Sequence, residues 1–567
     1  MRTEPIGSTP LTSAPDAALM FPTLTSAQIA RIASLGVTRP VTRGELLIEG
    51  GQTDVPFFVL QAGEIEVIRP SGLGDLLVAV LRPAQFTGDV SMILGRPAQM
   101  RLSVRESGEV VQLTRDQMHA LIQTDPEISE VLMRALLHRR IAMVAQGIGD
   151  ALLIGSGRSA ATLRIKEFLT RNGHPFKSLD LDRDAEVREL LDRFDVDRSE
   201  VPVLICRGSA VLRRPSNQEI ADRLGFNVRI DRDHLRDLII VGGGPAGLAA
   251  AVYAASEGLD ALVLEGSAPG GQAGSSSNIE NYLGFPMGIS GRDLAERAYA
   301  QARKFGADVM IAKGATELAC ERLPFGVSLD DGTSLRARTV IIATGARYRK
   351  PALANLQRFE GTGVYYSATF MEAQLCAGDE IIVVGGANSA GQAAVFLAQT
   401  ASRIHLLVRS STLSASMSRY LVRRIEDIPT IRIRTNTEIA ALEGDGHLES
   451  VQWRDRTGAS TSHEIRHVFL MTGAEANTGW LNGRVTLDEN GFIKTGPDLT
   501  HQDLAAAQWP LERSPYLLET SRPGVFAVGD VRRGNIKRVA SAVGEGSIAV
   551  SFVHRALAEY GARSAPA

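Results

Sequence analysis

Two glycine-rich segments of the chain carry residues suited to binding the diphosphate of a dinucleotide. The first follows an apolar run from Asp237 to Val241, and the second follows a similar run from Glu380 to Val384. Glycines directly after a strand permit a tight turn and let backbone N–H groups approach phosphate, whose charge then lies at a helix N-terminus. The candidate binding residues are Gly242, Gly244, Pro245, Ala246 and Gly247 in the first segment, and Gly385, Ala387, Asn388, Ser389 and Ala390 in the second. Two such segments predict two dinucleotides held side by side, with hydride transfer between them.

The strand that follows each segment indicates which dinucleotide is bound. After the first segment, the run ALVLE ends in Glu265, about 20 residues on, where an acid accepts a hydrogen bond from the ribose 2′-hydroxyl of a dinucleotide. After the second segment, the run RIHLLV is followed by Arg409, which complements the 2′-phosphate of NADPH, whereas NAD favours an acid there. We therefore expect NADPH at the second segment, with NADH as the alternative if Arg409 is an ordinary solvent-exposed strand end.

Composition limits the class of protein. The chain has 567 residues, too many for one core, and three or four domains are expected. Its formal net charge of −3, from nearly balanced acids and bases, provides no basic surface for nucleic acid. No apolar run approaches the roughly 20 residues of a membrane span. Residues 1–20, rich in Ser, Thr and Pro, lack the basic start and apolar core of a secretory signal and are expected to be a disordered tail.

The chain has three cysteines, Cys206, Cys320 and Cys376, which lie far apart and in no CxxC pair. This spacing excludes a disulfide framework and a cysteine zinc site, and no other metal site is expected. Few and unpaired cysteines are typical of a cytoplasmic protein. The sequence thus predicts a cytoplasmic chain with no metal, no nucleic-acid partner and no membrane span.

Residues 21–147 form the first expected domain, in which short strands precede a helix over 126–144. The stretches FFVLQAGEIEVI and FTGDVSMILGRPAQMRLSV resemble the cyclic-nucleotide-binding domain family, which implies a β-roll. That family uses an acid for the ribose and an arginine for the cyclic phosphate. Here the acid's place is taken by Asp89 and the arginine's by Ala98 or Gln99. A phosphate site without a matched cation favours an interaction or dimerisation module, in a homodimer, over a cyclic-nucleotide sensor.

Residues 150–230 form a second expected domain. Its expected elements are a strand at 151–154, a helix at 160–171, a strand at 176–180, a helix at 185–194, strands around Leu204 and Val211, and a helix at 217–224. This order of elements resembles the thioredoxin and glutaredoxin fold. The Val201–Pro202 step adds to the resemblance, because that family has a Val–Pro peptide bond in cis next to its active site. The family places CxxC at the start of the first helix, where this chain has SAAT at Ser159–Thr162. The fold is therefore expected without its dithiol, and Cys206 is expected to be buried and inert.

The remainder of the chain carries PGGQAGSSSNIENYLGFP, VIIATGA and GVFAVGDVRRGNIKRVASAVGEG in addition to the two glycine-rich segments. In this order the motifs resemble the low-molecular-weight thioredoxin reductases. The resemblance implies an FAD domain formed by residues 235–355 and 485–567, and an NAD(P)H domain formed by residues 356–484. The further cofactor-binding residues that it implies are Gly270, Gly271, Gln272, Asn281, Thr344, Gly345, Gly529, Asp530, Lys537, Arg538 and Val539. The expected fold class is multidomain α/β: a β-roll, a thioredoxin-like domain and two Rossmann-like domains.

The resemblance breaks at the redox dithiol. Thioredoxin reductases carry CxxC just before the second glycine-rich segment, where this chain reads YYSATFMEAQL, with Ser367 and Phe370 at the cysteine positions. Serine cannot perform thiol–disulfide exchange, which needs a thiolate, and Cys376 stands alone. No catalytic residue is therefore assigned.

The sequence leaves three functions open. The leading hypothesis is a FAD-dependent NADPH oxidoreductase that passes electrons directly to a small-molecule or protein acceptor. The second is a thioredoxin-disulfide reductase that uses cysteines of a partner protein. The third is a flavin-based redox or ligand sensor, in which the amino-terminal domains report the state of the flavin.

Overall fold

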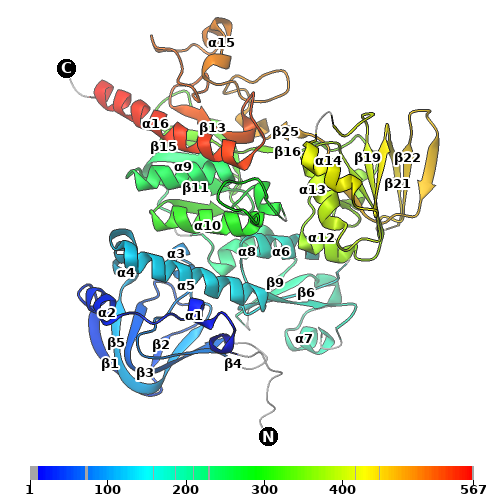
Figure 1. The fold of residues 1–567 in the computed structure, drawn as a ribbon. Helices are drawn as coiled ribbons and strands as arrows, with labels where there is room; N and C mark the ends of the chain where they lie inside the picture. The colour runs from blue at the N-terminus through cyan, green and yellow to red at the C-terminus, as the bar shows by residue number, and fades with distance from the viewer. Residues whose placement is uncertain are drawn as a thin grey trace.

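The computed structural model describes residues 10–69, 75–157, 159–184, 187–207, 210–227, 230–276, 278–414, 417–445 and 447–564 (Figure 1). At the amino-terminal end of this range, residues 10–20 form η1 (Leu11–Ser13) and α1 (Ala17–Met20), with Leu11 and Met20 buried. The prediction of a disordered tail is therefore wrong for residues 10–20, because their apolar side chains pack into the first domain. Residues 1–9 of that prediction lie outside the described residues.

An antiparallel β-roll forms the first domain, with strand order β1-β5-β3-β4 and β2 paired to β5. Its strands are β1 (Val37–Val41), β2 (Leu46–Ile48), β3 (Phe57–Arg69), β4 (Leu76–Leu81) and β5 (Arg101–Leu113). Its further helices are α2 (Ser26–Ala33), α3 (Val90–Leu94), α4 (Arg115–Thr124) and α5 (Pro126–Ala145). Side chains of Thr25, Thr114 and Asp125 accept backbone N–H groups at the starts of α2, α4 and α5. The helix expected over 126–144 is confirmed as α5.

The middle of the chain forms a four-stranded sheet in the order β7-β6-β8-β9, with β6 and β7 parallel and the other pairs antiparallel. Its elements are β6 (Ala151–Gly155), α6 (Ala160–Arg171), β7 (Phe176–Asp180), α7 (Val187–Arg193), β8 (Val203–Cys206), β9 (Ala210–Arg213) and α8 (Asn217–Leu224). These bounds agree with the expected order of elements, and the Val201–Pro202 peptide is cis. Ser159, in the SAAT stretch, accepts the Thr162 N–H (3.4 Å) and so caps α6.

A seven-stranded sheet carries the first glycine-rich segment, in the order β12-β11-β10-β15-β14-β13 with β26 beside β15. Its strands are β10 (Leu235–Val241), β11 (Ala261–Glu265), β12 (Asp308–Ile311), β13 (Ala315–Ala319), β14 (Phe325–Leu329), β15 (Ser334–Ile342) and β26 (Val525–Ala527). The associated helices are α9 (Pro245–Ser256), α10 (Gly291–Lys304), α15 (His501–Ala506) and α16 (Val539–Ser564). Strands β12, β11, β10, β15 and β26 are parallel, so their carboxyl ends lie at one edge.

A second parallel sheet, in the order β17-β24-β18-β19-β20, carries the other glycine-rich segment. Its elements are α11 (Leu356–Phe359), β17 (Val364–Tyr365), α12 (Phe370–Leu375), β18 (Glu380–Val384), α13 (Asn388–Leu397), β19 (Arg403–Val408), α14 (Arg419–Glu426), β20 (Ile431–Thr435) and β24 (Val468–Leu470). A three-stranded sheet of β21 (Glu438–Glu443), β22 (Ser450–Arg454) and β23 (Ser460–His463) follows β20. The antiparallel pair β16 (Ala346–Tyr348) and β25 (Ala474–Ala476) links the two α/β domains.

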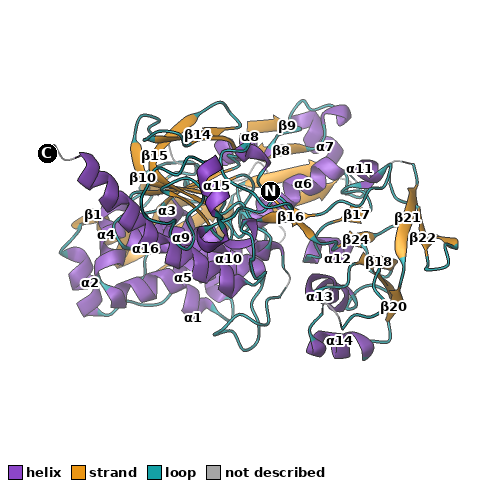
Figure 2. Cartoon of the chain, turned by 90° about the horizontal axis from the view of Figure 1, so that it is seen from above, coloured by secondary structure: helices purple, strands orange, loops and turns teal. Residues whose placement is uncertain are grey.

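Helices α16, α9, α10 and α5 follow one another from top to bottom in Figure 1, and they overlap in the view from above (Figure 2). Their apolar faces belong to one hydrophobic core that runs from Leu11 in the β-roll to Ala556 in α16. The β-roll, the middle sheet and the first α/β domain therefore share a core. Within the described residues, no helix is both long enough and apolar enough to cross a bilayer.

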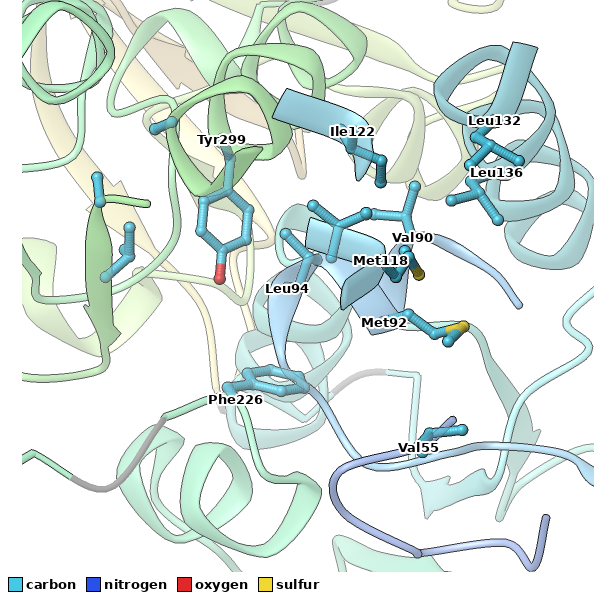
Figure 3. Close-up of a cluster of buried hydrophobic side chains, with 14 of the residues drawn as sticks. Val55, Val90, Met92, Leu94, Met118, Ile122, Leu132, Leu136, Phe226 and Tyr299 are labelled. Atoms are coloured by element: carbon cyan, nitrogen blue, oxygen red, sulfur yellow. The ribbon is translucent and has the colours of Figure 1, made fainter. Parts of the chain in front are cut away.

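Charged side chains lie inside the junction between the β-roll and α10. Arg140 of α5 is 0% exposed, and its Nε lies 3.6 Å from a carboxylate oxygen of Glu296 on α10. Arg96, which follows α3, donates to the Asn172 carbonyl oxygen (3.1 Å) and stacks on Phe226, 4.3 Å from the ring centroid. Figure 3 shows Tyr299 of α10 pointing from the other side toward Leu94 and Phe226. Burial raises the pKa of Glu296, and the neighbouring Arg140 opposes this rise.

We expect Glu296→Gln to destabilise the shared core strongly, because it leaves the buried Arg140 charge without its counter-ion. The expected loss is about 3–5 kcal/mol of unfolding free energy, measured by denaturant and thermal unfolding of the full chain. The matched control is Glu130→Gln, which removes an exposed Glu–Arg pair on α5 (3.4 Å to Arg134) and should cost at most about 1 kcal/mol. Combining Glu296→Gln with Arg140→Met should recover most of the loss. Equal effects of the two single substitutions would contradict the assignment.

Candidate functional site: two facing dinucleotide cradles

The first glycine-rich segment, which we call the first cradle (residues 242–247), joins β10 to α9 by a turn that excludes side chains. Gly242 has φ +109°, and a Cβ there would collide with the Ala343 carbonyl oxygen. A Cβ on Gly247 would collide with the Gly242 carbonyl oxygen. Gly244 is the N-cap of α9 and Pro245 its first residue, so free backbone N–H groups of the helix point out of this turn. The expected strand, turn and helix are thus confirmed.

Glu265, the last residue of β11, lies beside the first cradle. Its carboxylate accepts the N–H groups of Gly243 and Ser267, both at 2.8 Å. Burial raises the pKa of Glu265, while these two N–H groups oppose the rise. A half-buried acid at this edge is in the position from which a ribose hydroxyl is bound in dinucleotide folds.

The loop after β11 folds over the first cradle. The Gly270 N–H donates to the Gly243 carbonyl oxygen (2.7 Å), and a Cβ on Gly271 would lie 3.0 Å from the Cα of Gly244. Gln272 donates its side-chain amide to the Ala346 carbonyl oxygen at the crossover. Asn281 lies exposed further along, next to Glu280, which pairs with Arg424 of α14 (3.0 Å) rather than with the cradle.

The carboxyl-terminal motif returns to the same place. A Cβ on Gly529 would lie 3.0 Å from the Cβ of Ala246, in the first turn of α9. The half-buried Asp530 follows, and burial raises the pKa of its carboxyl group while nearby Lys537 opposes the rise. Lys537 and Arg538 are exposed just before Val539 begins α16. Two motifs almost 300 residues apart thus form one site, which the sequence predicted only through the family resemblance.

The second glycine-rich segment, the second cradle (residues 385–390), repeats this geometry between β18 and α13. Gly385 has φ +144°, and a Cβ there would lie 2.5 Å from the Met471 carbonyl oxygen. Ala387 is the N-cap of α13 in an extended conformation that alanine adopts freely. Asn388 and Ser389 are exposed in the first helical turn, and Ala390 is buried. Arg409 is exposed directly after β19, the strand beside β18.

Tyr348 of β16 lies near both cradles. Burial raises the pKa of its hydroxyl, Ser389 of the second cradle opposes this rise, and the nearby Asp530 adds to it. At the same crossover, Thr344 donates to the Asn477 carbonyl oxygen (2.8 Å), and the Asn477 N–H donates to the Gly345 carbonyl oxygen (3.0 Å). The sequence analysis did not identify Tyr348, because only the fold brings positions 348, 389 and 530 together.

The positions of the absent dithiol lie on the second α/β domain. Ser367 is half-buried, and Phe370 is the first residue of α12. Glu372, a buried acid in this helix that the sequence analysis did not identify, accepts the Thr369 N–H (2.8 Å). Burial raises the pKa of Glu372, and the nearby Glu167 of α6 contributes to this rise. The start of α6 also lies close to this domain, because a Cβ on Gly361 would lie 3.2 Å from the Cβ of Ala160.

At its other end, α6 reaches the first cradle. Arg171, its last residue, donates to the Gly271 carbonyl oxygen (2.9 Å), and its charge opposes the rise of the Glu265 pKa. Asn172 donates to the Ser267 carbonyl oxygen (3.3 Å). The middle domain therefore contributes two residues to the surroundings of the first cradle, which the sequence analysis did not predict.

All three thiols are buried. Burial raises the pKa of Cys206 to about 12, of Cys320 to about 11 and of Cys376 to about 12. A thiol with such a pKa is protonated at neutral pH and is a poor nucleophile. The prediction that Cys206 is buried is confirmed. Among the described residues, no three His, Cys, Asp or Glu side chains gather to hold a metal ion.

The first cradle fits FAD on the geometry of its own residues. Added Cβ atoms would collide with backbone at Gly242 and Gly247. No side chain caps the N-terminus of α9, so its backbone N–H groups can receive a diphosphate. The carboxyl groups of Glu265 and Asp530 provide hydrogen-bond acceptors for the sugar groups of the cofactor. The residues that would hold the cofactor are Gly242, Gly244, Glu265, Gly271 and Asp530. The second cradle fits a second dinucleotide on the same grounds.

The fold and the paired cradles define a FAD-dependent NAD(P)H oxidoreductase. A profile of the pyridine nucleotide-disulphide oxidoreductase family matches residues 236–546, more than half of the chain, and the chain belongs to this family. A profile of the cyclic nucleotide-binding domain family matches residues 38–125. These matches confirm the reductase-like and cyclic-nucleotide-binding-like parts of the prediction.

The chain is similar to several thioredoxin reductases. NADPH-dependent thioredoxin reductase 3 of Arabidopsis thaliana is 30% identical over 368 residues, which cover 62% of this chain and 65% of that protein. Thioredoxin reductase of Mycolicibacterium smegmatis is 33% identical over 326 residues, 57% of this chain and 97% of that protein. The crystal structure of Lactococcus lactis thioredoxin reductase matches with a TM-score of 0.51 and 26% identity, over 57% of this chain and 99% of that one.

We expect Gly247→Ala to abolish FAD retention, because its methyl group would meet the Gly242 carbonyl oxygen and push the cradle apart. The FAD released per purified chain should fall from about one to less than about one in ten. Gly479→Ala is the matched control, since a Cβ there meets nothing within 4 Å, and it should retain FAD. Full retention of FAD in Gly247→Ala would contradict the assignment of the first cradle.

Proposed function

We propose that the protein transfers hydride from NADPH to FAD and passes the electrons directly to an acceptor, without a dithiol of its own. Two observations support this proposal: Tyr348 lies near Ser389 of the second cradle and near Asp530 beside the first, and all three cysteine thiols are buried with raised pKa values. Bound FAD would supply the chemistry of accepting hydride and releasing electrons singly or in pairs.

The chain's own residues would bind and orient the two dinucleotides. The glycines of each cradle and the helix N-termini behind them would receive the diphosphates. Glu265 would accept from the ribose of FAD and Asp530 from its sugar chain, while Arg409 would pair with the 2′-phosphate of NADPH. Tyr348, near both Ser389 and Asp530, would lie between the two bound dinucleotides. With serine at position 367, no thiolate competes for the electrons.

Two alternatives rest on other observations. The named thioredoxin reductases among the relatives favour a thioredoxin-disulfide reductase that borrows cysteines from a partner. The core shared by the β-roll and the first α/β domain favours a sensor in which the amino-terminal domains report the state of the flavin. A homodimeric assembly and a cytoplasmic location stay predictions.

We also propose that residues 150–230 form a thioredoxin-like domain. The sheet order β7-β6-β8-β9 and the placing of α6 and α8 support it. In place of a dithiol, the start of α6 carries Ser159, whose hydroxyl caps the helix (3.4 Å to the Thr162 N–H). The domain would then serve as a structural contact between the cradles rather than as a redox carrier.

An anaerobic titration of the purified protein with NADPH, followed by a panel of acceptors, tests the proposed function. We expect NADPH to bleach the flavin and a quinone or dye to restore it. A flavin that NADPH does not reduce would overturn the proposal. Reduction followed by very slow reoxidation with every acceptor, together with a change of shape, would favour the sensor.

Arg409→Ala should raise the KM for NADPH about ten- to a hundredfold and leave that for NADH nearly unchanged, because only NADPH carries a phosphate for Arg409 to bind. Initial rates with each coenzyme measure this split. Arg403→Ala is the matched control: it is an exposed arginine at the opposite end of β19, paired with Glu380 (3.5 Å), and should change neither constant. An equal effect on both coenzymes would show that Arg409 has no part in phosphate recognition.

Replacing Cys206, Cys320 and Cys376 together by alanine should leave the NADPH-driven reduction of a quinone within about twofold of the native rate, because protonated buried thiols take no part in it. The native chain should reduce free thioredoxin negligibly. Thioredoxin reduction by the native chain that the triple replacement abolishes would refute direct transfer. The double variant Ser367→Cys and Phe370→Cys is the positive control, because it restores a dithiol and should confer measurable thioredoxin reduction.

A further inference from the structure

A chain of hydrogen bonds runs from the β-roll through the middle domain to the first cradle. Arg96, which follows α3 of the β-roll, donates to the carbonyl oxygen of Asn172 (3.1 Å). The Asn172 side-chain amide donates to the carbonyl oxygen of Ser267 (3.3 Å), and the Ser267 N–H donates to the carboxylate of Glu265 (2.8 Å). The same carboxylate accepts the N–H of Gly243 in the cradle (2.8 Å). These contacts connect the β-roll to the acid beside the cradle and to the backbone of the cradle itself.

The β-roll end of this chain is held in place by its surroundings. Gly95 ends α3 in a left-handed conformation (φ +70°), and the Arg96 N–H donates to the carbonyl oxygen of Ser91 in that helix (2.9 Å). Arg96 is 4% exposed, and its guanidinium lies 4.3 Å from the ring centroid of Phe226 and 5.9 Å from that of Tyr299. One ring belongs to the middle domain and the other to α10, so the guanidinium is fixed in the orientation that reaches the end of α6.

Asn172, the C-cap of α6, is the middle link, and it is 6% exposed. The same side-chain NH₂ group also donates to the Phe168 carbonyl oxygen within the helix (2.9 Å), so the amide cannot turn without losing a second bond. The preceding Arg171 donates to the carbonyl oxygen of Gly271 (2.9 Å). The end of α6 therefore holds the loop after β11 at two points.

The last link fixes the plane of a carboxylate. Oε1 of Glu265 accepts the Ser267 N–H, and Oε2 accepts the Gly243 N–H. A carboxylate held through both oxygens offers its remaining lone pairs to a ribose hydroxyl without first losing side-chain freedom. Movement of Ser267 would release one oxygen and allow the carboxylate to turn.

We propose that Arg96 and Asn172 are positioning residues for FAD, which act on the cofactor by fixing Glu265. This inference rests on the proposed binding of FAD at the first cradle. Neither residue belongs to the α/β domain that carries the cradle, so the affinity for FAD depends on both amino-terminal domains. Such coupling is reciprocal, and bound FAD in turn favours the position of α3 in which Arg96 reaches Asn172.

Equilibrium titration of the flavin-free full chain with FAD, followed by flavin fluorescence, tests the proposal. We expect Asn172→Ala to raise the Kd for FAD about three- to tenfold, the effect of losing about one hydrogen bond. Arg96→Met keeps an apolar stem between the two rings but loses the donor, and it should raise the Kd by a similar factor. An unchanged Kd in folded Arg96→Met would overturn the part assigned to the β-roll. If Arg96→Met fails to fold, Asn172→Ala still decides.

Two matched controls remove similar interactions elsewhere. Asn355→Ala removes a side-chain amide that donates to the Leu442 carbonyl oxygen in the second α/β domain (2.6 Å). Arg101→Met removes two ion pairs that stay within the β-roll, with Glu49 and Asp75 (3.1 Å each). Both variants should leave the Kd for FAD within about twofold of the native value, because neither shares a partner with the chain of hydrogen bonds.

Combination with Glu265→Ala separates positioning from general destabilisation. Glu265→Ala alone should raise the Kd about tenfold or more, because a charged acceptor for the ribose is lost. Adding Asn172→Ala should then change it by less than about twofold, since the carboxylate that Asn172 positions is gone. An unchanged Kd in either single variant, or effects that multiply in the double variant, would overturn the inference and leave the proposed function standing. A native chain that binds no FAD would overturn both.

Discussion

The packing of α10 between α9 and the β-roll is the contact on which the arrangement of the molecule depends. On one side α10 joins the sheet that carries the first cradle, and on the other it meets Arg140 and Arg96. Two buried guanidinium groups against one carboxylate, Glu296, form a charge arrangement that tolerates little displacement. Through this contact the β-roll packs directly against the α/β domain that carries the first cradle.

The sequence predicted best what is decided locally. Glycine positions in both cradles follow from steric limits within a few residues, and the bounds of α6, β7 and α8 follow from periodicity and capping. It failed for residues 10–20, where polar composition suggested disorder but Leu11 and Met20 found apolar partners across the β-roll. A few buried side chains are enough to order a short segment. The side chains that they pack against lie elsewhere in the sequence, so the composition of the segment alone does not predict its order.

Tyr348, Glu372 and Arg171 escaped prediction for a different reason. Each acquires its role through a contact made by folding: Tyr348 with Ser389, Glu372 with the approach of Glu167, and Arg171 with Gly271. Their types carry no motif. The raised pKa values of the three thiols likewise follow from burial, whereas the sequence showed only that the thiols were not paired.

Helix α6 acts as a strut, a rigid connection between the two α/β domains. Its first residue, Ala160, packs against Gly361 of the second α/β domain, and its last, Arg171, is bonded to Gly271 above the first cradle. The β16–β25 strand pair alone would allow the two α/β domains to rotate relative to one another. Such a rotation would break the contact of α6 with Gly361 or its hydrogen bond to Gly271. The strut thus biases the molecule toward a single relative pose of its two nucleotide domains. The relative orientation of the two nucleotide domains is therefore constrained by a helix that belongs to neither of them.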